Sequence, residues 1–135
     1  MTNLERTYKF LNDAGCYFLA TVENDQPRVR VFGTILCDGK KLYIQSGKSK
    51  NVSKQIFNNP KVEICACKGA EWIRIECELK EADDRNLRVK MLETMPSLRS
   101  MYNEDDGNMV MFEISNAKVT FASFTAPSET VTYRR

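Results

Sequence analysis

The sequence contains no histidine among its 135 residues. This absence excludes Ser-His-Asp and Cys-His catalysis and every metal site that needs an imidazole ligand. No apolar run approaches the ~20 residues that a membrane-spanning helix needs. The first residues also lack the apolar stretch of a secretory signal, so we expect a cytoplasmic protein without a membrane partner.

Neither sign of charge is in clear excess. Twenty Lys and Arg oppose 18 Asp and Glu, a net charge of +2, which gives no electrostatic basis for nucleic acid as a partner. The five cysteines are an odd number, and most lie in apolar, strand-like runs, so we expect buried, reduced thiols. Cys65 and Cys67 would share one face of a strand, but no second ligand pair completes a tetrahedral site, so we expect no metal.

What the chain does have is the length and composition of one globular domain, residues 1–135, with 42% apolar and 28% charged residues. A chain of this size can bury a core, but a deep cleft for a bulky cofactor would take up much of that core. We therefore expect a large ligand site to be shared with a second subunit. If the protein is an enzyme, the missing histidine favours chemistry supplied by a cofactor.

Hydrophobic periodicity predicts more strand than helix. The predicted helices are 3–12, a short one within 46–59, and one that begins at Asp83 and ends before Pro96. The predicted strands are 16–22, 28–37, 41–45, 61–67, 72–79, and a final hairpin of 109–114 and 119–124 turning at 115–117. The residues after Pro127 are expected to pack loosely or to reach a neighbour.

Short connections between strands predict an antiparallel sheet, and such a sheet avoids exposed edges best by closing on itself. We therefore expect a mainly β fold, a β-barrel of six to seven antiparallel strands with peripheral helices. The order of elements is not the βαβ pattern of a doubly wound nucleotide-binding fold.

Two arginines stand out on the second predicted strand. Arg28 and Arg30 are two positions apart, so they share one face. Adjacent guanidinium groups repel each other unless an anion or solvent lies between them. The pair is therefore either a solvated outer face or a fork that binds a phosphate through charge-assisted hydrogen bonds.

A turn rich in Ser and Lys, residues 46–50, lies between a strand end and a helix start. Hydroxyl groups, ammonium groups and the free amides of a helix N-terminus suit a phosphate, and the alternative is a solvated surface turn. A nucleoside-triphosphate loop is excluded because that motif needs glycine at position 42, where this chain has Leu42. Trp72 on the fifth predicted strand is either a core or interface anchor or a side chain that flanks a planar ring.

Three stretches together resemble the pyridoxamine 5'-phosphate oxidase-like FMN-binding split-barrel family. They are FLATVENDQPRVRVFGTIL, DGKKLYIQSGKSKNVSKQIFNNPKVEIC and EWIRIECEL. The resemblance runs from about Phe10 to Phe124, and PSLRSMYNEDDG is similar to the short bacterial branch related to nitroimidazole-resistance and general-stress flavoproteins.

This resemblance implies a homodimer that binds FMN between its subunits, with a small-molecule substrate or electron donor. It also implies the positions of the cofactor-binding residues. These are Arg28, Arg30, Val31 and Phe32 along the cofactor, Gln45 near the polar edge of the ring, Ser46 and Lys50 at the phosphate with Lys48 and Ser49 as helpers, and Trp72 reaching the flavin from the second subunit.

The segment from Lys50 to Pro60 is longer than in the vitamin-oxidising enzymes, so which of Lys48, Ser49 and Lys50 contacts the phosphate stays open. The C-terminal segment that grips pyridoxamine phosphate is missing, so oxidation of that vitamin is not expected. We expect an FMN-dependent oxidoreductase that acts on a small acceptor, with no catalytic side chain identified. The alternatives are a flavin-binding or storage protein without turnover, a related split barrel that binds heme or a deazaflavin, and a plain interaction module.

Overall fold

The computed structural model describes residues 1–133. Within them the chain forms three α-helices, one short 3-10 helix and eight strands. In chain order these are α1 (Asn3–Ala14), β1 (Tyr17–Glu23), β2 (Gln26–Phe32), β3 (Leu36–Asp38), β4 (Lys41–Gly47), α2 (Asn51–Asn58), β5 (Lys61–Lys68), β6 (Glu71–Glu81), α3 (Arg85–Thr94), η1 (Pro96–Ser100), β7 (Met109–Ser123) and β8 (Glu129–Tyr133).

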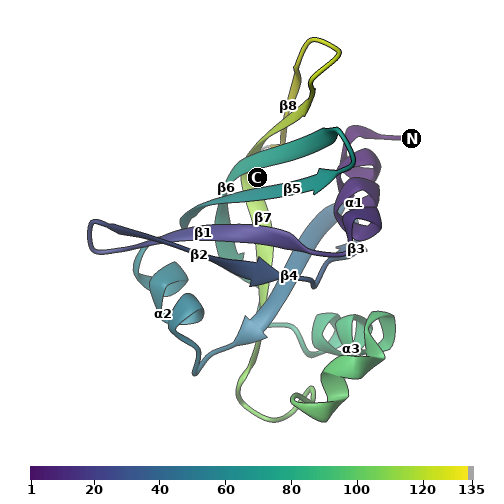
Figure 1. Cartoon of the computed structure of the whole chain (residues 1–135). Coiled ribbons are helices and arrows are strands. Elements are labelled where there is room, and N and C mark those ends of the chain that lie inside the picture. The colour runs from purple at the N-terminus through teal and green to yellow at the C-terminus, as the bar shows by residue number, and fades with distance from the viewer. Residues whose placement is uncertain (134–135) are drawn as a thin grey trace.

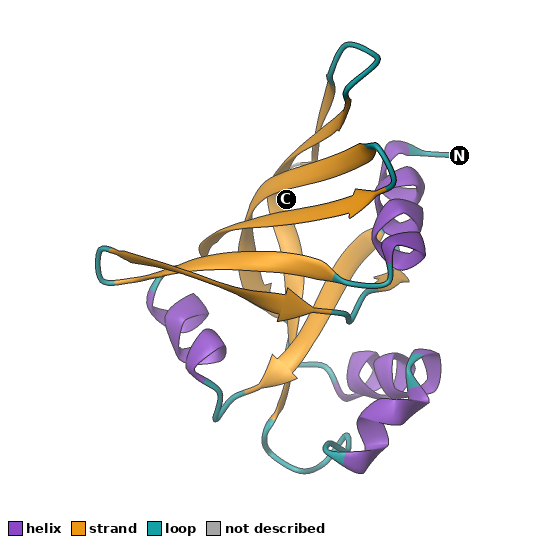
Figure 2. Ribbon diagram, viewed as in Figure 1, coloured by secondary structure: helices purple, strands orange, loops and turns teal. Residues whose placement is uncertain are grey.

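All eight strands belong to one antiparallel sheet with the order β2-β1-β5-β6-β7-β4-β3, and β8 also pairs with β7. The sheet curls on itself with the helices outside it (Figures 1 and 2). The expected mainly β fold with peripheral helices is confirmed, with eight strands in place of six to seven. No helix in the described part of the chain is long and apolar enough to cross a membrane.

β7 is one continuous strand, so the predicted hairpin with a turn at 115–117 is wrong. Glu76 pairs with Lys118 and Glu78 with Ser115, which places one extra residue on β7 between these pairs. Asn116 occupies that irregularity with φ of 49°. Asparagine tolerates this left-handed conformation, and it marks a β-bulge here as readily as it marks a turn.

The bulge divides β7 into two halves with different neighbours. The first half pairs with β4 and the second half pairs with β8, while β6 follows nearly the whole strand. Residues 129–133 form the strand β8, so the expectation of a loosely packed tail is wrong for them, and residues 134–135 of the predicted tail lie outside the described residues. Tyr133 and Thr7 share a hydrogen bond of 2.9 Å, which ties β8 to α1.

The predicted strand 28–37 is interrupted, because residues 33–35 leave the sheet between β2 and β3. Thr34 joins this crossing to β4 through its side chain. Its Oγ1 accepts a hydrogen bond from the Gln45 backbone N–H (2.9 Å) and donates to the Gln45 carbonyl (3.2 Å). The buried Tyr17 hydroxyl donates to the Thr34 carbonyl at 2.7 Å. Side chains rather than a ladder of backbone bonds hold the chain here.

Two hydrophobic clusters form the core. The larger fills the space enclosed by the sheet and includes Leu19, Ile44 and Phe112. The smaller lies where α3 contacts β3 and β7, and it includes Met91 and Tyr102. α1 contacts β3, β4 and β5, while α2 contacts β1, as Figure 1 shows. α2 therefore lies against β1, and its second half borders the β1–β2 turn.

All five cysteines are free, but their expected burial is wrong for most of them. Only Cys77 is buried, and burial raises the pKa of its thiol to about 12. Cys37 is half-buried, and Cys16, Cys65 and Cys67 are exposed. Strand alternation explains Cys65 and Cys67, because both point to the outer face of β5.

Candidate functional site

A pocket of about 240 Å³ lies where β2, the end of β4, the start of α2 and the segment after α3 meet. Residues from four separate parts of the chain line it. They are Arg30, Val31, Phe32, Gly33, Thr34, Gln45, Ser46, Lys50, Val52, Leu98, Met101 and Tyr102. The lining combines two cationic side chains with an apolar wall, which suits a ligand with an anionic end and an apolar body.

Arg30 is the cation on the β2 side of this pocket, and it is held by three neighbours. Its Nη1 donates to the Leu19 carbonyl (3.0 Å) and to Thr21 Oγ1 (2.8 Å), and its Nη2 donates to Gln55 Oε1 (2.7 Å). A guanidinium has five N–H bonds. No residue within 1–133 accepts from Nε or from the remaining N–H of Nη2, so two donors are left for a ligand.

Partial burial, and secondly the nearby positive charge of Arg28, lowers the pKa of Arg30 below its ordinary value. A guanidinium starts so far above neutral pH that it keeps its charge in a folded protein. Both causes lower this pKa, and no carboxylate is among them to raise it. Arg30 is therefore a cation without a carboxylate partner among the described residues. An anionic ligand would supply that partner.

The N-terminus of α2 forms the other side of the anionic end. Lys50 is its N-cap residue, and no side chain caps the helix by a hydrogen bond. The first amides of a helix without such a cap point outward and carry partial positive charge. Lys50 lines the pocket as well, and its Nζ lies 5.9 Å from the centre of the Tyr102 ring. Helix amides and a lysine therefore lie on the same side of the pocket.

Leu98, Met101 and Tyr102 form the apolar wall, which belongs to the segment between α3 and β7. Tyr102 is buried, whereas Met101 keeps 67% of its surface exposed. An exposed methionine beside a pocket is available to contact a ligand because its side chain is flexible and polarisable.

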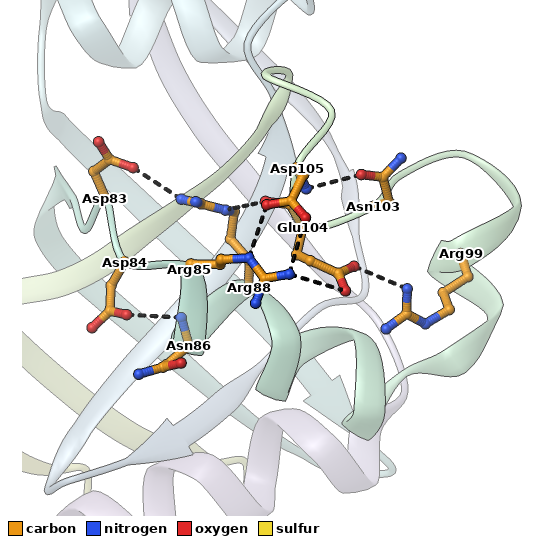
Figure 3. Close-up of polar contacts among 9 residues, drawn as sticks. All are labelled: Asp83, Asp84, Arg85, Asn86, Arg88, Arg99, Asn103, Glu104 and Asp105. Atoms are coloured by element: carbon orange, nitrogen blue, oxygen red, sulfur yellow. Dashed lines mark hydrogen bonds and ion pairs between the residues drawn. The ribbon is translucent and has the colours of Figure 1, made fainter.

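Ion pairs anchor this segment to α3, as Figure 3 shows. Glu104 accepts from Arg99 at 3.0 Å, and Arg85 pairs with Asp105 at 2.8 Å. Arg88 donates to the Glu104 carbonyl (2.9 Å) and to Asp83 (2.9 Å). Each exposed pair contributes little alone, but the set ties residues 104 and 105 both to the start of α3 and to Arg99 within the segment. The apolar wall therefore has a fixed position.

Hydrogen bonds to Asn108 connect the same segment to the turn after β4. The carbonyl and side-chain oxygens of Asn108 accept from the backbone amides of Lys48 (2.7 Å) and Ser49 (2.9 Å). Gly47 fits closely beside them, because a Cβ there would lie 2.9 Å from Asn108 Nδ2 and 3.0 Å from the Tyr102 hydroxyl. The apolar wall and the turn before α2 are thus in close contact.

The structure brings six of the ten predicted cofactor-binding residues to this pocket and leaves four outside its lining. Those at the pocket are Arg30, Val31, Phe32, Gln45, Ser46 and Lys50. Outside it, Arg28 pairs with Glu23 at 2.9 Å and Lys48 pairs with Glu81 at 3.8 Å, while Ser49 and Trp72 do not reach it.

Trp72 lies in a different hollow of about 370 Å³ between α1, β6 and β7, and its ring packs against Phe124 with centroids 4.9 Å apart. The three basic side chains of that hollow already have carboxylate partners. Arg6 pairs with Glu129 at 2.8 Å, and Lys9 and Lys68 both pair with Asp13. A third hollow of about 550 Å³ is bordered by three glutamates. A phosphate needs basic side chains that are not already paired with carboxylates, and neither hollow is suited to one for this reason.

Sequence reasoning missed the supporting polar residues Thr21 and Gln55, and it missed half of the pocket lining: Gly33, Thr34, Val52, Leu98, Met101 and Tyr102. Gln55 had a visible signal, because it is a polar residue on the buried face of an amphipathic helix. Thr21 and Thr34 carried none, since threonine is common in strands and loops. Tyr102 lies far from the other lining residues in sequence.

An exposed apolar strip lies beside the pocket, on the outer face of β1 and β2. Phe18, Val29 and Val31 keep 44%, 67% and 60% of their surface exposed. Phe18 is directly opposite Val31, and Ala20 is opposite Val29, so their side chains form one continuous surface. Val31 belongs to both the strip and the pocket lining.

Comparison with known proteins identifies the family. The model of the pyridoxamine 5'-phosphate oxidase family matches residues 4–123. The chain belongs to this family. The resemblance expected from the sequence is confirmed, and no curated protein sequence was found to match the chain.

Solved structures agree with this assignment. A NimC/NimA family protein from Clostridium acetobutylicum is 39% identical, with a TM-score of 0.92 over 96% of this chain and 91% of that one. An FMN binding protein related to pyridoxamine 5'-phosphate oxidase, from Nostoc punctiforme, has the same fold at 18% identity, with a TM-score of 0.69 over 98% of this chain and 87% of that one.

A heme binding protein from Mycobacterium smegmatis also has this fold, at 13% identity, with a TM-score of 0.72 over 96% of this chain. The match covers only 56% of that longer chain. The fold alone therefore does not select the cofactor, and the pocket residues have to decide it.

Proposed function

We propose that the protein binds FMN in the pocket between β2, β4 and α2, with the phosphate at its cationic end. The observation that carries this proposal is the convergence of Arg30, Lys50 and the N-terminus of α2 on one small pocket. These groups come from separate elements, and each is suited to a phosphate.

The donor set fits a phosphate in number as well as in charge. Arg30 offers two N–H bonds that have no acceptor among residues 1–133, and Lys50 and the first amides of α2 add further donors. Hydrogen bonds to charged groups contribute about 1.5–3 kcal/mol each. The apolar wall of Leu98, Met101 and Tyr102 suits the ring at the other end. Heme would lack a histidine ligand here, because the chain has none.

We further propose that two copies of the chain complete the site. A pocket of about 240 Å³ is below the ~300–1,000 Å³ usual for small-molecule sites. The exposed strip of Phe18, Val29 and Val31 borders it and suits burial against a second copy. Trp72 of that second copy is then available to flank the ring from outside the pocket.

The proposed activity is a flavin-dependent oxidoreductase that acts on a small acceptor such as a quinone or a nitro compound, in the cytoplasm. When bound, FMN supplies the redox chemistry. The chain's own residues fix the phosphate through Arg30 and Lys50, orient the ring along β2 and exclude water with the Tyr102 wall. No side chain is assigned as a catalytic acid or base.

Purification from a native host followed by ligand analysis tests the proposal. We expect a yellow dimeric protein whose released ligand has the mass of FMN, and reduction of that flavin by NADH or NADPH in the presence of a nitroaromatic acceptor. A bound flavin that neither donor reduces would leave a storage protein in place of an enzyme. A colourless monomer that FMN does not load would overturn the binding proposal.

A further inference from the structure

Gln55 is a buried polar residue that touches the phosphate-binding side of the pocket without lining the pocket. It lies on the inner face of α2 and keeps only 6% of its surface exposed. Its Oε1 accepts two hydrogen bonds, one from Arg30 Nη2 at 2.7 Å and one from the Thr21 hydroxyl. A ligand in the pocket would not reach it.

The three side chains form a closed triangle. Arg30 donates to both Thr21 and Gln55, and Thr21 in turn donates to Gln55. Both terminal nitrogens of the guanidinium are therefore fixed. The unused N–H bonds of Arg30 point in the direction that this triangle sets.

Gln55 also connects the two phosphate-binding elements. It is part of α2, whose first turn begins after Lys50, while Arg30 belongs to β2. The hydrogen bond from Arg30 to Gln55 thus joins the strand cation to the helix whose amides form the other side of the pocket. Without it, Arg30 would have to become ordered when the ligand binds, which lowers affinity.

We propose that Gln55 is a positioning residue for the phosphate, acting through Arg30 and not by contact with the ligand. This inference rests on the proposed function and extends it to a residue outside the pocket. A purely structural role for Gln55 predicts equal losses for any ligand of the pocket. A positioning role predicts a loss that depends on the phosphate.

Gln55→Met tests this by removing the acceptor while keeping the length of the side chain. We expect the Kd for FMN to rise about tenfold, with the Kd for riboflavin, which lacks the phosphate, unchanged. Gln26→Met is the matched control, because Gln26 is exposed on β2 and donates only to the neighbouring Pro27 carbonyl. It should leave both affinities unchanged.

A double-mutant cycle separates positioning from independent binding. In an Arg30→Ala background, Gln55→Met should cause no further loss of FMN affinity, because the group through which it acts is gone. If the two losses add, or if riboflavin weakens as much as FMN, the proposal for Gln55 is overturned. Gln55→Leu, which also removes the acceptor of the Arg30 hydrogen bond, gives the same readings if Gln55→Met does not fold.

The wild-type protein separates this inference from the proposed function. If the wild type binds riboflavin as tightly as FMN, the phosphate site itself is wrong and Gln55 has nothing to position. If the wild type prefers FMN and Gln55→Met keeps the full preference, only the role of Gln55 is overturned.

Discussion

Arg28 and Arg30 share one face of β2, but their guanidinium groups bind different partners. Arg28 pairs with the exposed carboxylate of Glu23 at 2.9 Å. Arg30 points toward α2, where it donates to Gln55, and it lines the pocket. Two residues that are equivalent in the strand pattern are therefore not equivalent in the folded chain.

The two arginines provide a matched pair of substitutions. We expect Arg30→Ala to weaken FMN binding at least tenfold because it removes charge-assisted donors at the phosphate. Arg28→Ala should change the affinity less than threefold, since an exposed ion pair contributes about 0–1 kcal/mol. Titration of the flavin fluorescence measures both. Equal losses for the two variants would show that Arg28 contacts the cofactor in the assembled protein.

The apolar strip on β1 and β2 predicts an interface that charge should disrupt. Phe18→Lys and Val29→Lys each place an ammonium group in the centre of this surface, and we expect dimers to dissociate because burying an unpaired charge is costly. Val29 does not line the pocket, so its effect reports on assembly alone. Sedimentation velocity gives the mass.

Thr132→Lys is the control for this pair, because Thr132 is an exposed residue on β8. It adds the same charge to the same sheet and should leave the dimer intact. A wild-type chain that sediments as a monomer would contradict the proposed interface directly.

The close packing around Gly47 predicts that adding a side chain at this position lowers the stability of the protein. An added Cβ would lie 2.9 Å from Asn108 Nδ2 and 3.0 Å from the Tyr102 hydroxyl, so the apolar wall would have to move. We expect Gly47→Ala to lower the free energy of unfolding by about 1–3 kcal/mol. At Gly33 the nearest atom to an added Cβ is 3.6 Å away, so Gly33→Ala should be tolerated. Thermal denaturation compares the two.

The hydrogen bonds of the Asp106 carboxylate predict that the protein loses stability at acidic pH. Burial acts to raise the pKa of this carboxylate, but hydrogen bonds from the amides of Met109, Asn103 and Asn108 outweigh it, so the pKa lies below the ordinary value of 3.8. A lowered pKa in the folded state means stability that is present above 3.8 and is lost as the pH falls through the folded value.

Asp106→Ala should therefore destabilise the protein by about 1 kcal/mol near neutral pH, as the loss of a capping carboxylate does. The difference from wild type should shrink as the pH falls below 3.8, and it should vanish once the carboxylate of the folded wild type is also protonated. Denaturant unfolding at several pH values measures this. Asp25→Ala is the control, because Asp25 is exposed in the β1–β2 turn, and it should change the free energy of unfolding by less than ~0.5 kcal/mol. A constant difference at every pH would contradict the assignment.

The mainly β class and most elements could be predicted from the sequence because they depend on local patterns. Period-two alternation marks β5 and β6, and helical spacing marks α1. The same patterns failed at Asn116, since a residue that tolerates positive φ can end a strand or form a bulge within one. Which of these occurs depends on β6, a strand distant in sequence.

By itself, therefore, the sequence determined that the chain has no imidazole chemistry, that strands dominate, and that two cationic elements lie near two strand ends. Only the tertiary structure decided that Arg30 rather than Arg28 lines the pocket, that Lys50 is on the same pocket, and that Gln55 holds Arg30. The physical reason is register. The pairing of β1 with β2 and the packing of α2 against β1 decide which side chains meet, and both are contacts between residues far apart in the chain.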